Sequence, residues 1–185
     1  GTCTVVHRES SEQVNSRCSM SSTPFAAVTI NAPPSKVWNI LTDIQNWSTI
    51  ISGIDDVVIT KGGPKLEVGL TWDETRVMFG RSETERMEIV EFDDDGYVLK
   101  SKSESCGMLM EFEHRIIANE SCNDDDGNND NGGNEKETSV LELYYTSRAL
   151  TWMACAFAWV GLLTRGMMRK VVLQDLNDIK AAAEG

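Results

Sequence analysis

The sequence predicts an α+β fold in which a curved, seven-stranded antiparallel sheet wraps around one long C-terminal helix. Two observations carry this prediction. Several segments between residues 25 and 147 alternate apolar and polar side chains and are separated by Gly, Pro and Asp clusters, as the strands of an antiparallel sheet are. From Leu150 to Ala183 a helical pattern runs without proline, and a sheet with one apolar face needs such a helix to cover it.

One strand and two short helices precede the main part of the predicted sheet. Phe25–Ile30 alternates as a strand does, and Pro33 and Pro34 then fix the backbone where a helix can start. Apolar residues follow at helical spacing, namely Val37, Trp38, Leu41 and Ile44. We expect a second short helix at Trp47–Ile51, and the two helices together should close one end of the sheet.

The remaining strands are bounded by turn-forming residues. They are predicted at Asp55–Lys61, Leu70–Phe79, Arg81–Phe92, Tyr97–Ser105, Met108–Ala118 and Thr138–Ser147. In the fifth of these segments one face carries Met108, Met110, Phe112, His114 and Ile116. The sheet is therefore expected to have one apolar face.

The last helix should turn an apolar stripe toward that face. Projected with helical geometry, the stripe consists of Met168, Val172, Leu176, Ile179 and Ala183. Extended toward the start of the helix, it passes through Arg165, Gly161 and Phe157 and includes several small residues. Small residues predict either tight contact between helix and sheet or a gap that serves as a ligand cavity.

The region around the first helix resembles a known superfamily. Ala32-Pro33-Pro34, Val37-Trp38, Asp43 and Trp47 resemble the START and birch-pollen-allergen (SRPBCC) proteins, in particular their polyketide cyclase/dehydrase-like branch. The resemblance extends over about Phe25 to Glu184. It implies a helix-grip fold whose cavity, between sheet and C-terminal helix, holds a small hydrophobic ligand such as a lipid, an isoprenoid or an aromatic polyketide.

On this interpretation the protein binds or transports its ligand without converting it. The expected sheet wall consists of Trp72, Met108, Met110, Phe112, Leu141 and Leu143, and Phe157, Gly161 and Arg165 lie opposite. Methionines adapt to irregular ligand shapes, although at strand spacing they also serve as plain core. Trp38 and Trp47 are expected to be structural anchors.

The alternative is an enzyme of the cyclase or dehydratase type. Its candidate catalytic residues are His114, Tyr145 and Arg165, which would handle protons or enolate charge. Arg165 would anchor an anionic ligand group, pair with Glu74 or Glu85, or turn outward. The sequence shows no Ser-His-Asp order, glycine-rich phosphate loop or metal-spaced cluster, so no cofactor and no metal are expected.

The start of the last helix suggests a third function. Trp152 and Trp159 project away from the sheet in the same helical projection and would form an exposed apolar surface, unless this part of the helix turns them into the cavity. Such a surface predicts a homodimer or contact with a membrane surface. It would also suit a chaperone-regulating or membrane-associated interaction module.

Composition narrows the classes of partner. The net charge of −12 argues against nucleic-acid binding, and five scattered cysteines without a CxxC pair suggest reduced thiols in an intracellular protein. The apolar start of the last helix is too short to span a bilayer. Residues 1–24 are expected to be a disordered tail and residues 25–185 one ligand-binding domain. Residues 119–137 are expected to form an acidic, flexible loop, and their sequence only partly matches a calcium-binding loop.

Overall fold

A computed structural model describes residues 23–63, 65–78, 80–119, 137–152 and 158–185, and of residues 78 and 158–164 it describes the backbone alone. The predicted tail at 1–24 and the acidic loop at 119–137, with its partial calcium-loop pattern, lie almost entirely outside the described residues. The predictions for these two segments therefore stay predictions.

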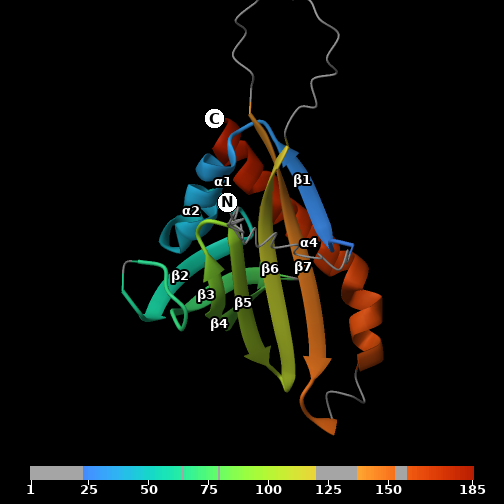
Figure 1. Cartoon of the computed structure of the whole chain (residues 1–185). Helices are drawn as coiled ribbons and strands as arrows, with labels where there is room; N and C mark the ends of the chain where they lie inside the picture. Colours follow the sequence, from blue (N-terminus) through green and yellow to red (C-terminus); the bar gives the residue numbers. More distant parts are fainter. Residues whose placement is uncertain (1–22, 64, 79, 120–136, 153–157) are drawn as a thin grey trace, which may run out of the picture.

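The described strands form one open antiparallel sheet in the order β1-β7-β6-β5-β4-β3-β2. They are β1 (Ala26–Ile30), β2 (Ile54–Lys61), β3 (Thr71–Met78), β4 (Arg81–Asp93), β5 (Val98–Ser105), β6 (Met108–Asn119) and β7 (Thr138–Ala149). All seven were predicted within a few residues of these bounds. The strands curve around α4 (Ala158–Glu184), which confirms the predicted fold (Figure 1).

The hairpin between β5 and β6 shows how local sequence sets the register. Cys106 and Gly107 form its two-residue turn, and both have positive φ, as a type I′ turn requires. This turn pairs Ser105 with Met108 and, further along, Leu99 with His114. Because side chains alternate along a strand, the turn thereby determines which β6 residues face α4.

Three short helical segments separate β1 from β2. They are α1 (Pro34–Thr42), the 3-10 segment η1 (Ile44–Asn46) and α2 (Trp47–Ile50). They lie at the end of the sheet where α4 ends, as Figure 1 shows. One expectation is wrong at the other end of α4: β7 continues through Ala149, so Leu150 lies in a bend and does not begin the helix.

The core fills the space between the inner face of the sheet and α4. On α4 the predicted stripe is buried at Val172, Leu176, Ile179 and Ala183. Fully or nearly fully buried sheet residues face it, including Ile30, Trp72, Ile89, Leu99 and Leu141. Each of these large apolar side chains contributes about 1.5–3 kcal/mol when it leaves water, which explains why the long helix stays on the sheet.

Trp38 joins α1 to the far part of the sheet. Its ring stacks on Phe92 and meets Tyr97 edge-on, with centroids 5.6 Å apart in each case. Its Nε1 donates a hydrogen bond of 2.5 Å to Oδ1 of Asp94. Trp38 thus has both its apolar and its polar parts satisfied by the fold, as a structural anchor requires.

Candidate functional site

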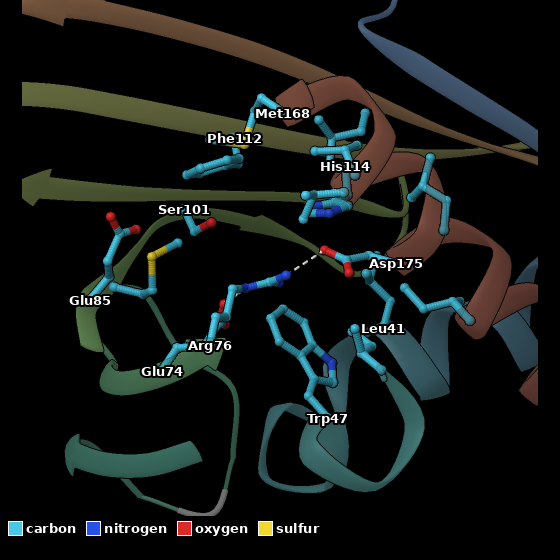
Figure 2. A pocket seen from close by; sticks show the side chains of 17 residues that line it. Leu41, Trp47, Glu74, Arg76, Glu85, Ser101, Phe112, His114, Met168 and Asp175 are labelled. Atoms are coloured by element: carbon cyan, nitrogen blue, oxygen red, sulfur yellow. Dashed lines mark hydrogen bonds and ion pairs between the residues drawn. The ribbon is translucent and has the colours of Figure 1, made fainter. Parts of the chain in front are cut away.

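A cavity of about 170 Å³ lies between the inner face of the sheet, α2 and α4 (Figure 2). Most of its lining is apolar and comes from Leu41, Trp47, Ile51, Met87, Phe112, Leu143, Met168, Val171, Val172, Leu176 and Ile179. The polar part of the lining consists of Glu74, Arg76, Glu85, Ser101, His114 and Asp175. The cavity therefore combines an apolar wall with several groups able to form hydrogen bonds.

The polar part begins on β3, where every second residue points inward. Because Trp72 is fully buried, the alternation of the strand also turns Glu74 and Arg76 toward α4. Nε1 of Trp72 donates to Oε2 of Glu74 at 3.2 Å, and Nε of Arg76 donates to Oε1 of Glu74 at 2.5 Å. These contacts hold the Arg76 guanidinium in a fixed position.

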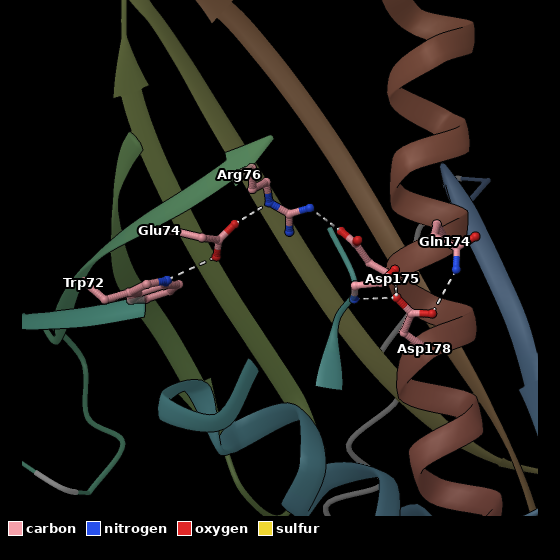
Figure 3. Close-up of polar contacts among 7 residues, drawn as sticks. Trp72, Glu74, Arg76, Gln174, Asp175 and Asp178 are labelled. Carbon is pink, nitrogen blue, oxygen red and sulfur yellow. Dashed lines mark hydrogen bonds and ion pairs between the residues drawn. The ribbon is translucent and has the colours of Figure 1, made fainter. Parts of the chain in front are cut away.

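Arg76 also reaches across to the helix. Its Nη1 donates to Oδ2 of Asp175 at 2.8 Å, so that one guanidinium binds two carboxylates (Figure 3). Gly53 permits this approach, because a Cβ there would lie 3.3 Å from Oδ1 of Asp175 and 3.4 Å from Nη1 of Arg76. The sequence thus places its smallest residue beside the ion pair.

The Arg76–Asp175 pair separates the cavity from a second hollow. This outer hollow is more open, has a volume of about 310 Å³, and is lined by Gly53, Arg76, Val77, Met167, Lys170, Val171, Gln174 and Asp175. Arg76, Val171 and Asp175 line both spaces. These three residues therefore lie between the two spaces.

Burial dominates the electrostatics of this pair. It raises the pKa of Asp175 to about 6, although the charge and hydrogen bond of Arg76 act in the opposite direction. Burial also opposes the charge of Arg76, but Glu74 and Asp175 outweigh it and raise the arginine pKa. Arg76 therefore stays charged, while Asp175 exchanges its proton close to neutral pH.

Glu85 lies directly opposite Glu74 in the pairing of β4 with β3. Burial raises the pKa of Glu85, and the negative charge of Glu74 raises it further. Within the described residues Glu85 makes no hydrogen bond or ion pair, whereas Glu74 holds Arg76. The charge of Arg76 opposes this rise, but Glu85 has no direct ion-pair partner in the described part of the chain.

His114 faces the cavity from β6. Burial, followed by the charge of Arg76, lowers the pKa of its imidazole to about 4, so the ring is neutral at physiological pH. Part of the ring surface borders the cavity, and protein surrounds the rest. Nδ1 of His114 is buried and has no hydrogen-bond partner among the described residues.

Unpartnered polar atoms gather around the cavity. In the described part of the chain four buried side-chain atoms lack a hydrogen-bond partner, and three belong to lining residues: Nε1 of Trp47, Nδ1 of His114 and Oδ1 of Asp175. The fourth is Oγ of Ser103, the next inward-facing residue after Ser101 on β5. Buried polar atoms are normally paired with protein groups or ordered water, so this set marks polar positions close to the cavity that the described protein groups leave unpaired.

The sequence prediction of the site agrees with this lining at Phe112, Leu143 and His114. Four other expected wall residues lie outside it: Trp72 and Leu141 are fully buried in the core, and Met108 and Met110 are half-buried further along β6. The side chains of Phe157 and Gly161 lie outside the described residues. The cavity therefore occupies only part of the predicted wall.

Tyr145 faces the inner side of the sheet, as its alternation with Leu141 and Leu143 predicts. It packs against the core, with its ring centroid 5.3 Å from those of Phe25 and Phe112. It does not belong to the lining of the cavity. Its predicted catalytic role therefore has no cavity contact to support it.

The expected position of Arg165 opposite the sheet wall is corrected. Its side chain is exposed, with the guanidinium carbon 5.9 Å from the centre of the Phe25 ring. A charged group on this turn of the helix reaches water at little cost. Of the three possibilities that the sequence left open for Arg165, the structure thus shows the one in which the side chain turns outward. Arg76 on β3 is the arginine of the cavity.

Sequence reasoning missed Arg76, Asp175 and Trp47 as site residues. The sequence did contain a signal for Arg76, because the alternation that turns Trp72 inward also turns Glu74 and Arg76 inward. Trp47 was taken as an anchor alone. It does pack edge-on against Trp72, with centroids 5.9 Å apart, but it also lines the cavity.

The predicted exposed surface near the start of the last helix is described only in part. Trp152 is 80% exposed, whereas the side chain of Trp159 lies outside the described residues. Contact with a membrane or a second copy through these tryptophans stays a prediction. Within the described part of the chain, no helix has the length and apolar character needed to cross a bilayer.

A family model described as polyketide cyclase / dehydrase and lipid transport matches residues 18–184. The chain belongs to this family. No curated protein matches it. Membership in the polyketide cyclase / dehydrase and lipid transport family confirms the resemblance that the sequence around the first helix indicated. The match begins before β1 and includes all of α4.

Solved structures show that this family member has the helix-grip fold. Protein TTHA0849 from Thermus thermophilus has a TM-score of 0.60 at 14% identity, over 84% of this chain and 92% of that one. The Zhui aromatase/cyclase from Streptomyces sp. R1128 has a TM-score of 0.58 at 18% identity, over 86% and 91%. Ara h 8.0201 has a TM-score of 0.52 at 12% identity, over 85% and 94%.

Proposed function

We propose that the protein binds a small, largely apolar molecule in the cavity between the sheet and α4 and carries it without converting it. The observation behind this proposal is the combination of an apolar lining with three unpartnered polar atoms on residues around one interior space. Apolar contact supplies affinity, and a few polar groups determine orientation in typical ligand sites. The lipid-transport part of the family description supports the same function.

The volume of the cavity restricts the ligand. At about 170 Å³ it is close to an engineered apolar cavity of about 150 Å³ that binds benzene, and below the roughly 300 Å³ of the smallest typical drug-sized pockets. A single substituted ring or a short isoprenoid matches this space. A longer lipid or an aromatic polyketide of several rings requires α4 or the Arg76–Asp175 pair to move outward.

Native mass spectrometry of the gently purified full chain tests the proposal. We expect a bound molecule that is released by organic solvent and contains few polar groups. A Met168→Trp variant, which fills the cavity from α4, should be recovered without it. An empty wild-type protein that also fails to take up small ring compounds would contradict the proposal.

A cyclase- or dehydratase-type enzyme is the second candidate, because Asp175 can give up a proton near neutral pH. In a dehydration, an acid would protonate the departing hydroxyl while a base removes a proton from the adjacent carbon, and water leaves. His114 would be the base, but an imidazole with a pKa of about 4 is a weak base at neutral pH. The low pKa of His114 therefore favours the binding function over the enzyme.

Substitution of His114 distinguishes the two candidates. In a binding protein, His114→Gln should change ligand affinity only slightly, because glutamine keeps a hydrogen-bonding group at the cavity wall. In an enzyme the same variant should lose turnover of the ligand recovered from the native protein. Product formation by the wild type, followed by mass spectrometry, would overturn the carrier proposal.

A further inference from the structure

The charges around the cavity are unequal. Three carboxyl groups line it, on Glu74, Glu85 and Asp175, whereas Arg76 supplies the single positive charge among the described lining residues. His114 does not add a second, because burial keeps its pKa low. An ionised ligand therefore enters a space in which negative charge predominates.

The one cation of the lining is already bound. Arg76 donates from Nε to Glu74 at 2.5 Å and from Nη1 to Asp175 at 2.8 Å. A ligand carboxylate could reach the guanidinium only by replacing one of these contacts, which would leave a buried carboxylate without its cation. Such a loss is strongly unfavourable in a partly buried pair.

Glu85 places part of the excess of carboxyl groups over cations at one end of the cavity. It borders the cavity with no ion-pair partner in the described chain, and its cross-strand neighbour is Glu74. Figure 2 shows the Glu85 carboxyl group at the opposite end of the cavity from Asp175. An anionic group therefore meets a carboxyl group without an ion-pair partner at one end of the space, and at the other end a carboxylate that already holds Arg76.

The polar groups of Trp47, His114 and Asp175, which line the cavity, favour a ligand that forms hydrogen bonds without carrying negative charge. The indole N–H of Trp47, whose side chain is 6% exposed, needs an acceptor. Oδ1 of Asp175 needs a donor when the carboxyl group is ionised, and Nδ1 of His114 takes either role according to its tautomer. A hydroxyl group both donates and accepts, and an amine supplies donors for the carboxylates.

We propose that the cavity selects small ring compounds bearing a hydroxyl or amine group and excludes carboxylates and phosphates. This inference rests on the proposed binding function and specifies the chemical class of its ligand. It places the selection in Glu74, Glu85 and Asp175, three carboxyl groups that share Arg76 as the one cation of the described lining.

Four probes with the same ring separate apolar binding from charge selection. They are toluene, benzyl alcohol, benzylamine, which is protonated at neutral pH, and benzoate. Binding is followed by ¹H–¹⁵N NMR at the Trp47 indole N–H, assigned with a Trp47→Phe variant. We expect benzyl alcohol and benzylamine to bind at least about tenfold more tightly than benzoate.

A matched pair of variants assigns the selection to the cavity. Glu85→Gln should strengthen benzoate binding by about tenfold above the pH at which Glu85 ionises, because it removes a carboxylate without an ion-pair partner. Glu104→Gln removes the same charge from an exposed position on β5, beside the inward-facing Ser103, and should leave benzoate binding unchanged.

The outcomes separate this inference from the proposed function. If benzoate binds as tightly as benzyl alcohol, or more tightly, charge selection is wrong although the cavity still binds ring compounds. If none of the four probes shifts the Trp47 signal of the folded protein, both the selection and the binding function are wrong. The wild-type series decides this even if Glu85→Gln fails to fold.

Discussion

Arg76 on β3 and Asp175 on α4 form an ion pair of 2.8 Å across 99 residues of chain. The contact joins the sheet to its covering helix, and Glu74 holds the same guanidinium from the sheet side. The pair is largely shielded from solvent, with 21% of the Arg76 side chain and 15% of the Asp175 side chain exposed. The contact between sheet and helix and the polar lining of the cavity therefore both depend on the Arg76 guanidinium.

Replacement of Arg76 should reveal this dependence. Arg76→Met leaves Glu74 and Asp175 shielded from water without a cation, and we expect the free energy of unfolding to fall by about 3–5 kcal/mol at pH 7. Urea denaturation measures the change. The control is Arg86→Met, which breaks an exposed ion pair between Arg86 of β4 and Asp73 of β3 and should alter stability little. Equal losses in the two variants would show that burial of the Arg76 pair contributes nothing.

Asp175 and His114 should give opposite dependences of stability on pH. For Asp175 the folded pKa of about 6 exceeds its ordinary value of 3.8, so its contribution to stability decreases by about 3 kcal/mol as the pH rises from 4 to 6. For His114 the folded pKa of about 4 is below its ordinary value of 6.5, so its contribution increases by about 3 kcal/mol as the pH rises from 4 to 6.5. In the wild type these contributions largely cancel.

Single substitutions should expose each dependence. Relative to wild type, Asp175→Asn should gain stability as the pH rises through this window, and His114→Gln should lose it. Chemical denaturation at pH 4, 5, 6 and 7 measures both curves. Parallel curves for the two variants and the wild type would show that neither group has the shifted pKa.

Filling the cavity from α4 should abolish binding without disturbing the fold. Met168 lines the cavity and is only half-buried, so Met168→Trp can place its ring in the space at a cost of about 1–3 kcal/mol in stability. We expect the affinity for benzyl alcohol to fall at least about tenfold, since the ring occupies the ligand volume. The adjacent Met167 is 46% exposed and lines the outer hollow alone, so Met167→Trp should bind benzyl alcohol as the wild type does.

Two tryptophans from neighbouring helices should behave differently. Trp38→Phe removes the hydrogen bond to Asp94 and part of the ring stack, and we expect a stability loss of about 1–2 kcal/mol with unchanged ligand affinity. Trp47→Phe removes an N–H that has no partner in the described structure, so its stability should change less. Calorimetric titration should show weaker binding of benzyl alcohol but unchanged binding of toluene. A loss of toluene binding would mean that the ring of Trp47, and not its N–H, carries the effect.

The sequence predicted most of the fold because the fold depends on periodic patterns. Alternation along Met108–Ala118 places His114 and Phe112 on the inner face, and the structure agrees at both positions. The stripe on the last helix was also correct from Val172 to Ala183, where buried and exposed positions follow one helical phase. These predictions required only local geometry and an apolar face.

The candidate site was harder to predict because it depends on contacts between distant elements. Arg165 was placed opposite the sheet by extending the helical phase of the apolar stripe toward the start of the helix. Its charged side chain instead turns toward solvent, which costs little at an exposed position. No periodic pattern in the sequence indicates that Arg76 pairs with Asp175. Predicting this pair requires knowing how far β3 lies from α4 in the folded protein. Alternation alone could predict that Arg76 faces inward, and not which carboxylate it meets.

The central claim is that a ligand occupies the space between the sheet and α4. A crystal structure of the protein soaked with iodobenzene tests it directly, because the anomalous scattering of iodine locates the ring. We predict an iodine peak inside the cavity bordered by Phe112, His114 and Val172, with the Arg76–Asp175 pair intact. Iodine bound only on the surface, with the cavity empty or closed by side chains, would contradict the account.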